Sequence, residues 1–317
     1  LAMRKIHALP SLHELETMLD SCRPIAQKGV TASYIPALKS ADSSMLGICI
    51  AGNNGELLLA GDTEKIFSMQ SIVKILILTC SLLDSGIERV AEKVSIEPSS
   101  DRFNDIINLE TKNNHKPLNP MINAGAIACL TLVRGNTFQE KTERIVSFAK
   151  QLSGNSTLNI DEEVYISEKL TGSRNRALCY YMQSTGVIDG EIDVEALLDA
   201  YFYVCSIAVT CVDLARIAQV FANNGQDMRT GDTLFSRNIS RVVRAAMVMC
   251  GMYTESGSVA VRIGLPTKSG VGGGIISLVP ESAGIGIYGP ALNQAGSSIA
   301  GLALLERISN VMDASIF

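Results

Sequence analysis

The stretch FSMQSIVKILILTCSLLDSG, residues 67–86, places one lysine inside an otherwise apolar run of helix formers. Lys74 lies three residues after Ser71, and residues three apart share one face of a helix. Burying an ammonium group costs free energy unless the group is paired or neutralised. The stretch is therefore either a helix whose lysine extends to solvent, or part of a reactive site.

The spacing of these two side chains suits nucleophilic catalysis. A serine hydroxyl is a poor nucleophile until a base takes its proton, and a desolvated lysine can be that base because burial lowers its pKa. The N-terminus of a helix adds a partial positive charge that stabilises a developing oxyanion. Ser-x-x-Lys also occurs by chance, so this motif alone favours a surface serine beside a lysine that extends to solvent.

A second motif lies near the end of the chain, in LPTKSGVGGGI at residues 265–275. Lys268, Ser269 and Gly270 stand at the start of a predicted strand, where glycines let the backbone lie close against a substrate. The first motif is the Ser-x-x-Lys signature of penicillin-binding proteins and β-lactamases, and the second, in the same order along the chain, resembles their Lys-Thr-Gly strand. Together they favour a reactive site over an ordinary glycine-rich turn.

Hydrophobic periodicity predicts the elements around these motifs. A hairpin is expected at 45–60, where two apolar runs flank Asn-Asn-Gly, and three strands at 257–290, which is rich in glycine and β-branched residues. Strands from the two chain ends can complete one antiparallel sheet, so we expect an α+β fold with a mainly helical second lobe and a cleft between the lobes. Helices are expected at 10–22, 138–152, 161–169, 174–184, 193–203, 210–223, 238–250 and 297–313, with an apolar helix near Ala124.

The composition argues against several classes of protein. The chain has 317 residues, of which 47% are hydrophobic and 19% charged, so it can bury a sizeable core and disorder is not expected. The net charge is −5 without a cluster of basic residues, which argues against nucleic acid as a partner and against an amphipathic membrane anchor. No stretch of about 18 apolar residues predicts a membrane-spanning helix.

The cysteines and histidines indicate a reduced protein without a metal site. The chain has 8 cysteines, none of them in a Cys-x-x-Cys pair, and most lie in apolar surroundings such as LGICIAG. Reduced, buried thiols and the lack of an apolar signal core near the N-terminus predict a cytoplasmic protein. His7, His13 and His115 are too scattered to bind a metal ion together.

Several stretches resemble the serine-dependent glutaminases, which share the β-lactamase/DD-peptidase-like fold. These stretches occur in family order and extend over nearly the whole chain. The resemblance implies a single glutaminase domain over 1–317, with a sheet lobe at approximately 1–70 and 255–317 and a helical lobe at approximately 71–254. The matching stretches are SYIPAL (33–38), MQSIVK (69–74), KPLNPMINAGAI (116–127), SEKLTGSRNRALCYYM (167–182), YFYVCSIAVT (201–210), CGMYTESG (250–257) and GLPTKSGVGGGI (264–275).

The resemblance also implies an activity, which is hydrolysis of L-glutamine to L-glutamate and ammonia without a metal or organic cofactor. It makes Ser71 the acylated nucleophile, Lys74 its base and Tyr253 a proton shuttle. The backbone N–H groups of Ser71 and Val271 match the oxyanion hole. The residues expected to bind the amino-acid end of glutamine are Tyr34, Gln70, Asn123, Glu168, Asn175 and Tyr201.

These residue types suit glutamine, although each also has an ordinary structural interpretation. An anion such as Glu168 can bind the α-ammonium, and amide donors such as Asn123 and Asn175 can bind the α-carboxylate. A tyrosine can protonate the leaving ammonia. Alternatively, Glu168 is a solvated helix charge and Asn123 is a helix N-cap. Tyr201 and Tyr253 can equally be core aromatics.

Three functions remain open from the sequence: a glutaminase, another acyl-serine amidohydrolase of the β-lactamase-like fold, and a binding module that kept the fold. The chain lacks the Ser-Asp-Asn triplet of the penicillin-interacting relatives, which argues against penicillin-type chemistry. It resembles the compact microbial type without ankyrin repeats. Because family members usually assemble as homodimers or homotetramers, the resemblance implies a homo-oligomer here.

Overall fold

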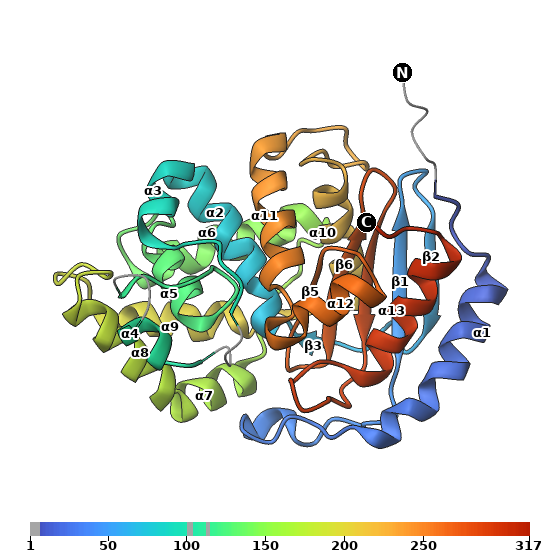
Figure 1. Ribbon diagram of the computed structural model, residues 1–317, viewed down its shortest axis with the longest axis horizontal. Helices are drawn as coiled ribbons and strands as arrows, with labels where there is room; N and C mark the ends of the chain where they lie inside the picture. The colour runs from blue at the N-terminus through green and yellow to red at the C-terminus, as the bar shows by residue number, and fades with distance from the viewer. Residues whose placement is uncertain (1–6, 100–103, 112–114) are drawn as a thin grey trace.

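Strands from both ends of the chain form one antiparallel sheet, as the sequence predicted. A computed structural model describes residues 7–99, 104–111 and 115–317 (Figure 1). The central pairing joins segments that are far apart in the sequence, because Gly47 lies opposite Tyr288 and Gly52 opposite Ala283. Across the sheet the strands are β2 (Leu57–Gly61), β1 (Gly47–Gly52), β7 (Ala283–Tyr288), β6 (Gly274–Val279) and β5 (Thr267–Ser269).

The hairpin expected at 45–60 is confirmed as β1 and β2. Its turn uses Gly55 at a φ of 86°, a left-handed conformation that glycine adopts without a steric penalty. The Gly55 N–H donates to the carbonyl of Gly52 at 3.1 Å and so closes the turn.

Alternating side chains divide the core into two layers on opposite faces of the sheet. In β1, Ile48 and Ile50 join a cluster with the flanking helices α1 (Leu12–Cys22) and α13 (Ile299–Val311). Cys49 and Ala51 point the other way and join the larger cluster of the helical part. This period of two is the property of a strand that is buried on both faces.

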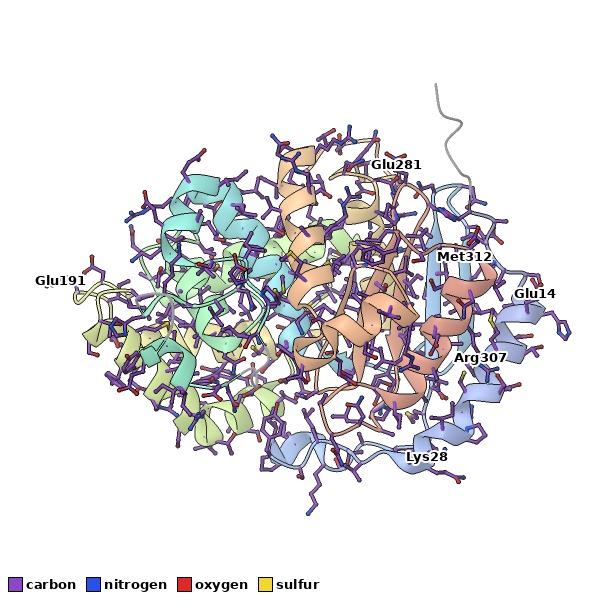
Figure 2. The ribbon with its side chains drawn as sticks, viewed as in Figure 1. Glu14, Lys28, Glu191, Glu281, Arg307 and Met312 are labelled. Atoms are coloured by element: carbon purple, nitrogen blue, oxygen red, sulfur yellow. The ribbon has the colours of Figure 1, made fainter. Side chains whose placement is uncertain are left out.

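Helices α1 and α13 lie side by side across the first face (Figure 1). The start of α1 is fixed by a capping box, in which Ser11 and Glu14 exchange hydrogen bonds between side chain and backbone. Arg307 of α13 donates to Ser21 Oγ of α1 at 2.6 Å, and Figure 2 shows Arg307 and Glu14 on this side of the molecule. The two terminal regions of the chain therefore support each other.

Helix α10 (Cys211–Ala222) packs directly on the second face of the sheet, against β7, β1 and β6. Its backbone comes so close that β7 has glycine at two positions that face it. A Cβ at Gly284 would lie 2.1 Å from the carbonyl oxygen of Ala215. A Cβ at Gly286 would lie 2.2 Å from the carbonyl oxygen of Cys211, so neither position can carry a side chain without moving the helix.

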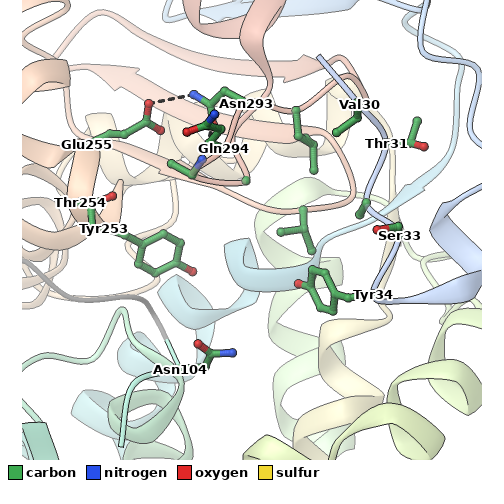
Figure 3. A pocket seen from close by; sticks show the side chains of 15 residues that line it. Val30, Thr31, Ser33, Tyr34, Asn104, Tyr253, Thr254, Glu255, Asn293 and Gln294 are labelled. Carbon is green, nitrogen blue, oxygen red and sulfur yellow. Dashed lines mark hydrogen bonds between the residues drawn. The ribbon is translucent and has the colours of Figure 1, made fainter. Parts of the chain in front are cut away.

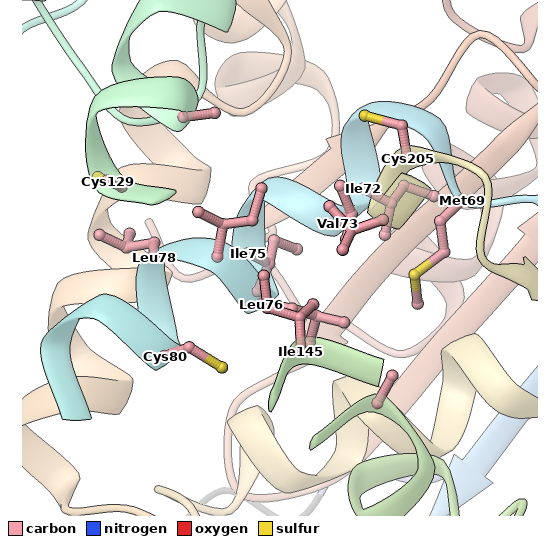
Figure 4. Packing of buried hydrophobic residues seen from close by; sticks show 14 of the residues in the cluster. Met69, Ile72, Val73, Ile75, Leu76, Leu78, Cys80, Cys129, Ile145 and Cys205 are labelled. Carbon is pink, nitrogen blue, oxygen red and sulfur yellow. The ribbon is translucent and has the colours of Figure 1, made fainter. Parts of the chain in front are cut away.

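Helix α2 (Val73–Ser85) lies at the centre of the helical part, and its residues from Val73 to Leu82 are all buried. Figure 4 shows its apolar side chains packed among those of neighbouring helices. The other elements of this region are β3 (Phe67–Ser68), η3 (Gln70–Ile72), α3 (Ile87–Lys93), α4 (Ile107–Thr111), α5 (Asn123–Thr131), α6 (Phe138–Ser153), α7 (Glu162–Thr171), α8 (Ser173–Ser184), α9 (Val194–Cys205), β4 (Ala208–Val209), α11 (Arg237–Cys250) and η5 (Tyr253–Glu255).

Two expectations need correction. The stretch 257–290 does contain three strands, but its first residues belong to helix α12 (Ser256–Arg262). Val259 is buried and Val261 is 88% exposed, so their β-branched side chains suggested a strand where the burial follows a helix. Ser71 lies in the 3₁₀ turn η3, immediately before α2 rather than within it.

In the part of the chain that the structure describes, no helix combines the length and apolar character needed to cross a membrane.

The contact between α10 and β7 can be tested by adding one methyl group. We expect Gly286→Ala to lower the free energy of unfolding by about 2 kcal/mol, because the new Cβ meets rigid backbone. Gly190→Ala is the control, since a Cβ there has no atom within 4 Å. Urea unfolding of both variants measures the difference, and equal stability of the two would contradict the packing described here.

Candidate active site

Ser71 lies on a strained turn between β3 and α2. Gln70, the residue before it, has a φ of 50°, which a non-glycine residue keeps only where its surroundings hold it. The buried Gln70 side chain donates from Nε2 to Ser68 Oγ at 3.1 Å. This contact and the buried β3 hold the turn, so the backbone position of Ser71 is fixed by its neighbours.

The glycine-rich segment after β5 lies against the same turn. A Cβ at Gly270 would be 2.5 Å from the carbonyl oxygen of Met69, and one at Gly272 would be 2.7 Å from that of Ser68. Val271 stands between these two glycines and is thereby brought next to the turn of Ser71. The two glycines therefore let this segment lie close against the backbone of the turn.

Lys74 is 0% exposed and is therefore not a lysine that extends to solvent. Its Nζ donates to Asn123 Oδ1 at 2.7 Å and to the Tyr253 hydroxyl at 3.2 Å. Burial lowers the pKa of the amine from its ordinary value of 10.5 to about 7, although Cys205 and Glu168 nearby act in the opposite direction. Near neutral pH the amine can thus exist unprotonated, as a general base must.

Asn123 joins the helices around Lys74. It is the first residue of α5, where Ile122 occupies the N-cap position, so the N-cap interpretation of Asn123 is wrong. Its Nδ2 donates to Asn175 Oδ1 of α8 at 2.8 Å, and the hydroxyl of Tyr201 in α9 donates to its Oδ1 at 3.4 Å. These three side chains are all buried. A continuous polar cluster therefore lies inside an apolar helical core.

Tyr253 contributes its hydroxyl from the far end of the chain. It also has a positive φ, of 53°, at the start of η5. Burial raises the pKa of its phenol, while a hydrogen bond with Ser71 acts in the opposite direction. The phenol therefore stays protonated near neutral pH and can donate a proton in a reaction.

Lys268 also lies near Tyr253, and its motif in the sequence did not predict this contact. This residue of β5 is 0% exposed, and its Nζ lies 4.1 Å from the centroid of the Tyr253 ring. The amine donates to the carbonyl of Ser269 at 2.7 Å, and burial lowers its pKa, as does the nearby Lys74. The sequence could have indicated a buried Lys268, because this lysine lies in a predicted strand and is flanked by residues that are buried. The alternation of side chains along a strand does not predict which aromatic ring the lysine contacts.

Three of the predicted residues lie at a pocket. Tyr34, Tyr253 and Val271 line a cavity of about 880 Å³, together with Glu255 and the loop that contains Asn293 (Figure 3). Tyr34 is 53% exposed, which suits a residue at the mouth.

Glu168 extends from α7 into the region of Lys74. It is half-buried, and burial raises the pKa of its carboxyl to about 7, against the opposing influence of Lys74. The surroundings of this carboxyl therefore oppose its ionisation more than bulk solvent would.

Among residues 7–99, 104–111 and 115–317, no three His, Cys, Asp or Glu side chains gather in a way that could hold a metal ion.

Comparison with known proteins gives close matches over almost the entire chain. A family model described as Glutaminase matches residues 29–317. A glutaminase of Clostridium tetani is 50% identical over 304 residues, which cover 96% of this chain and 99% of that protein. A glutaminase of Clostridium botulinum is 48% identical over 303 residues, with coverage of 96% and 99%.

Solved structures share the same arrangement. A probable glutaminase of Bacillus subtilis has a TM-score of 0.90 at 37% identity and covers 96% of this chain and 97% of its own. A covalent complex of the Bacillus subtilis glutaminase with 5-oxo-L-norleucine, formed by reaction with 6-diazo-5-oxo-L-norleucine, has a TM-score of 0.89 at 36% identity. It covers 97% of this chain and 100% of its own.

The burial of Lys74 predicts a conflict between stability and activity. The unfolded chain holds the Lys74 proton up to about pH 10.5, whereas the folded chain releases it at about pH 7, so burial destabilises the fold most near and below pH 7. We expect Lys74→Met to raise the free energy of unfolding by about 2 kcal/mol near pH 7, and by less near pH 10.

Thermal or urea unfolding at both pH values measures this effect. Lys28→Met, at an exposed position, serves as the control and should change stability by less than about 0.5 kcal/mol. A Lys74→Met protein less stable than wild type near pH 7 would refute the interpretation of Lys74 as a strongly desolvated amine.

Proposed function

The chain belongs to the glutaminase family and hydrolyses L-glutamine to L-glutamate and ammonia, and we propose that it does so through a glutamyl ester on Ser71. Its α+β fold is the β-lactamase-like fold that the sequence resemblance implied. One observation carries the proposed mechanism. Lys74, three residues after Ser71, is fully buried, and its amine donates hydrogen bonds to Asn123 and Tyr253.

In the proposed first step, Ser71 Oγ attacks the carbon of the glutamine side-chain amide and its proton passes to Lys74 Nζ. A pKa of about 7 makes Lys74 an effective acceptor near neutral pH. The oxyanion is stabilised by the backbone N–H groups of Ser71 and Val271, which the close approach of Gly270 and Gly272 to residues 68 and 69 supports.

The tetrahedral intermediate then releases ammonia. The bond between carbon and nitrogen breaks, and Tyr253 donates its hydroxyl proton to the leaving nitrogen. Lys74, whose Nζ lies 3.2 Å from that hydroxyl, returns the proton to Tyr253. A water molecule next attacks the glutamyl ester by the reverse relay, so Ser71 regains its proton and glutamate leaves. The groups used are side chains and backbone amides of this chain.

The substrate would be oriented by the polar groups around this relay. We assign the α-ammonium to Glu168, as the resemblance implied, because a carboxylate can pair with an ammonium group and the burial of this one favours a cationic partner. The amides of Asn123 and Asn175 are assigned to the α-carboxylate. Tyr34, Gln70 and Tyr201 are assigned to the remaining polar contacts, as the resemblance implied. The second candidate, another acyl-serine amidohydrolase, uses the same Ser71 and Lys74 but a different substrate.

We also propose that the protein is cytoplasmic and forms a homodimer or homotetramer. All 8 cysteines are buried free thiols, which supports a reducing compartment. The oligomeric state can be measured by analytical ultracentrifugation.

The mechanism predicts which variants lose ammonia release from L-glutamine. We expect Ser71→Ala and Lys74→Ala to lower kcat at least about 10³-fold, because nucleophile and base act as one unit. Tyr253→Phe should lower kcat by about 10²-fold or more, since it removes only the proton donor. Full activity of Ser71→Ala would exclude the ester. Turnover of L-asparagine or a chromogenic cephalosporin in preference to glutamine would favour the second candidate.

The fall of activity on the acidic side of the pH profile should reflect the protonation of two groups. Neutral Lys74 and ionised Glu168 both require loss of a proton near pH 7, so kcat/KM should fall steeply as the pH drops below about 7. In Glu168→Gln only Lys74 titrates, so the fall of kcat/KM at low pH should become less steep. KM should also rise, because the partner of the α-ammonium is lost. A pH profile that keeps the same slope in this variant would contradict the role of Glu168.

A further inference from the structure

The turn that carries Tyr253 needs support from outside itself. Tyr253 begins the 3₁₀ turn η5 at a φ of 53°, and such a backbone persists in a non-glycine residue only where the surroundings hold it. The chain continues directly into α12. The hydrogen bond from Glu255 N–H to the Met252 carbonyl, at 2.9 Å, is local and does not fix the turn against the rest of the molecule.

The side chain of Glu255 provides a connection to a distant segment. Its Oε1 accepts from Asn293 Nδ2 at 2.8 Å, as the dashed line in Figure 3 shows, and its Oε2 accepts from Ser297 Oγ at 2.9 Å. Ser297 is 0% exposed, and its Oγ lies 3.4 Å from Ser269 Oγ of β5. Both carboxylate oxygens are therefore used, and the contact extends to the strand that carries Lys268.

The segment that receives Glu255 is itself rigidly held. Asn293 Oδ1 accepts from the N–H groups of Ala295 at 3.0 Å and Ser297 at 3.1 Å. Leu292 and Val30 exchange backbone hydrogen bonds of 2.8 and 3.0 Å. Because this loop forms a wall of the pocket, Glu255 connects the Tyr253 turn to a fixed wall rather than to a flexible surface.

We propose that Glu255 is a positioning residue for Tyr253. Its carboxylate, held by Asn293 and Ser297, keeps the strained turn in place and so keeps the phenol within reach of Lys74 Nζ. This inference rests on the role proposed above for Tyr253 and goes beyond it. Positioning requires that residue 255 makes two hydrogen bonds, and it does not require a negative charge there. Binding of the substrate ammonium by Glu255 would require the charge, so a neutral residue that keeps the hydrogen bonds distinguishes the two roles.

The test uses steady-state kinetics of glutamine hydrolysis. Glu255→Ala should lower kcat by about 10- to 100-fold, because a displacement of about 1 Å has effects of this size, with KM changed less than about 3-fold. Glu255→Gln should recover most of kcat, because its amide can still accept from Asn293 and can donate to Ser297 Oγ. Ser297→Ala removes one of the two contacts and should give an intermediate kcat.

Glu140→Ala is the matched control for a general loss of stability. Glu140 also accepts two hydrogen bonds, from the N–H groups of Asn136 and Thr137 at the start of α6. Its loss should lower the melting temperature but leave kcat unchanged. The double variant Tyr253→Phe/Glu255→Ala completes a double-mutant cycle. If Glu255 acts through Tyr253, the kcat of the double variant should be no lower than that of Tyr253→Phe alone.

Two results would overturn the inference. One is wild-type kcat in both Glu255→Ala and Ser297→Ala. The other is a Glu255→Gln protein with a raised KM and no recovery, which would assign the charge of Glu255 to substrate binding. Full activity of Tyr253→Phe would instead remove the proposed role of Tyr253 itself. The kinetics therefore distinguish a failure of this inference from a failure of the mechanism on which it rests.

Discussion

The constraint on which the rest of the structure depends is the burial of the Lys74 amine. An amine without access to solvent requires hydrogen-bond acceptors at fixed positions, and here they come from α5 and η5, which lie 49 and 179 residues further along the chain. The apolar surroundings of α2 exclude water and so bring the pKa to about 7. The large helical core offsets the free energy lost by placing a polar group inside it. The proposed role of Lys74 as a base thus depends on packing.

The sequence predicted those features that depend on short-range patterns. The hairpin at 45–60 and most helices followed from periodicity and turn residues, whereas Ser71 lies in the turn η3 before α2 and not within the helix that the spacing suggested. Helix α12 was missed because Val259 and Val261 favour strands. In the structure Val259 is buried and Val261 is exposed, as on the two faces of a helix. The contacts of Lys268 and Glu255 were beyond prediction from periodicity, since each depends on how two distant segments meet.

The residues that carry the site also break local conformational rules. Gln70 and Tyr253 both have positive φ without being glycine, one directly before the serine and the other at the phenol itself. Such conflicts between local preference and global structure concentrate at functional sites, where tertiary contacts impose what the chain alone would avoid. In this fold the contacts of Gly270 and Gly272 with residues 68 and 69, and those of Glu255 with the loop at 293–297, lie beside these two residues.

The pairing of β1 with β7 has a consequence for biosynthesis. β1 is complete at residue 52, but its central neighbour begins only at residue 283. At ribosomal rates of about 5–20 residues per second, the apolar hairpin waits on the order of 10–50 s before that neighbour emerges. During this time one edge of β1 has unpaired N–H and C=O groups, which can pair with the same hairpin of another nascent chain. The edge of β1 is therefore exposed to such pairing for as long as the helical middle of the chain is being made.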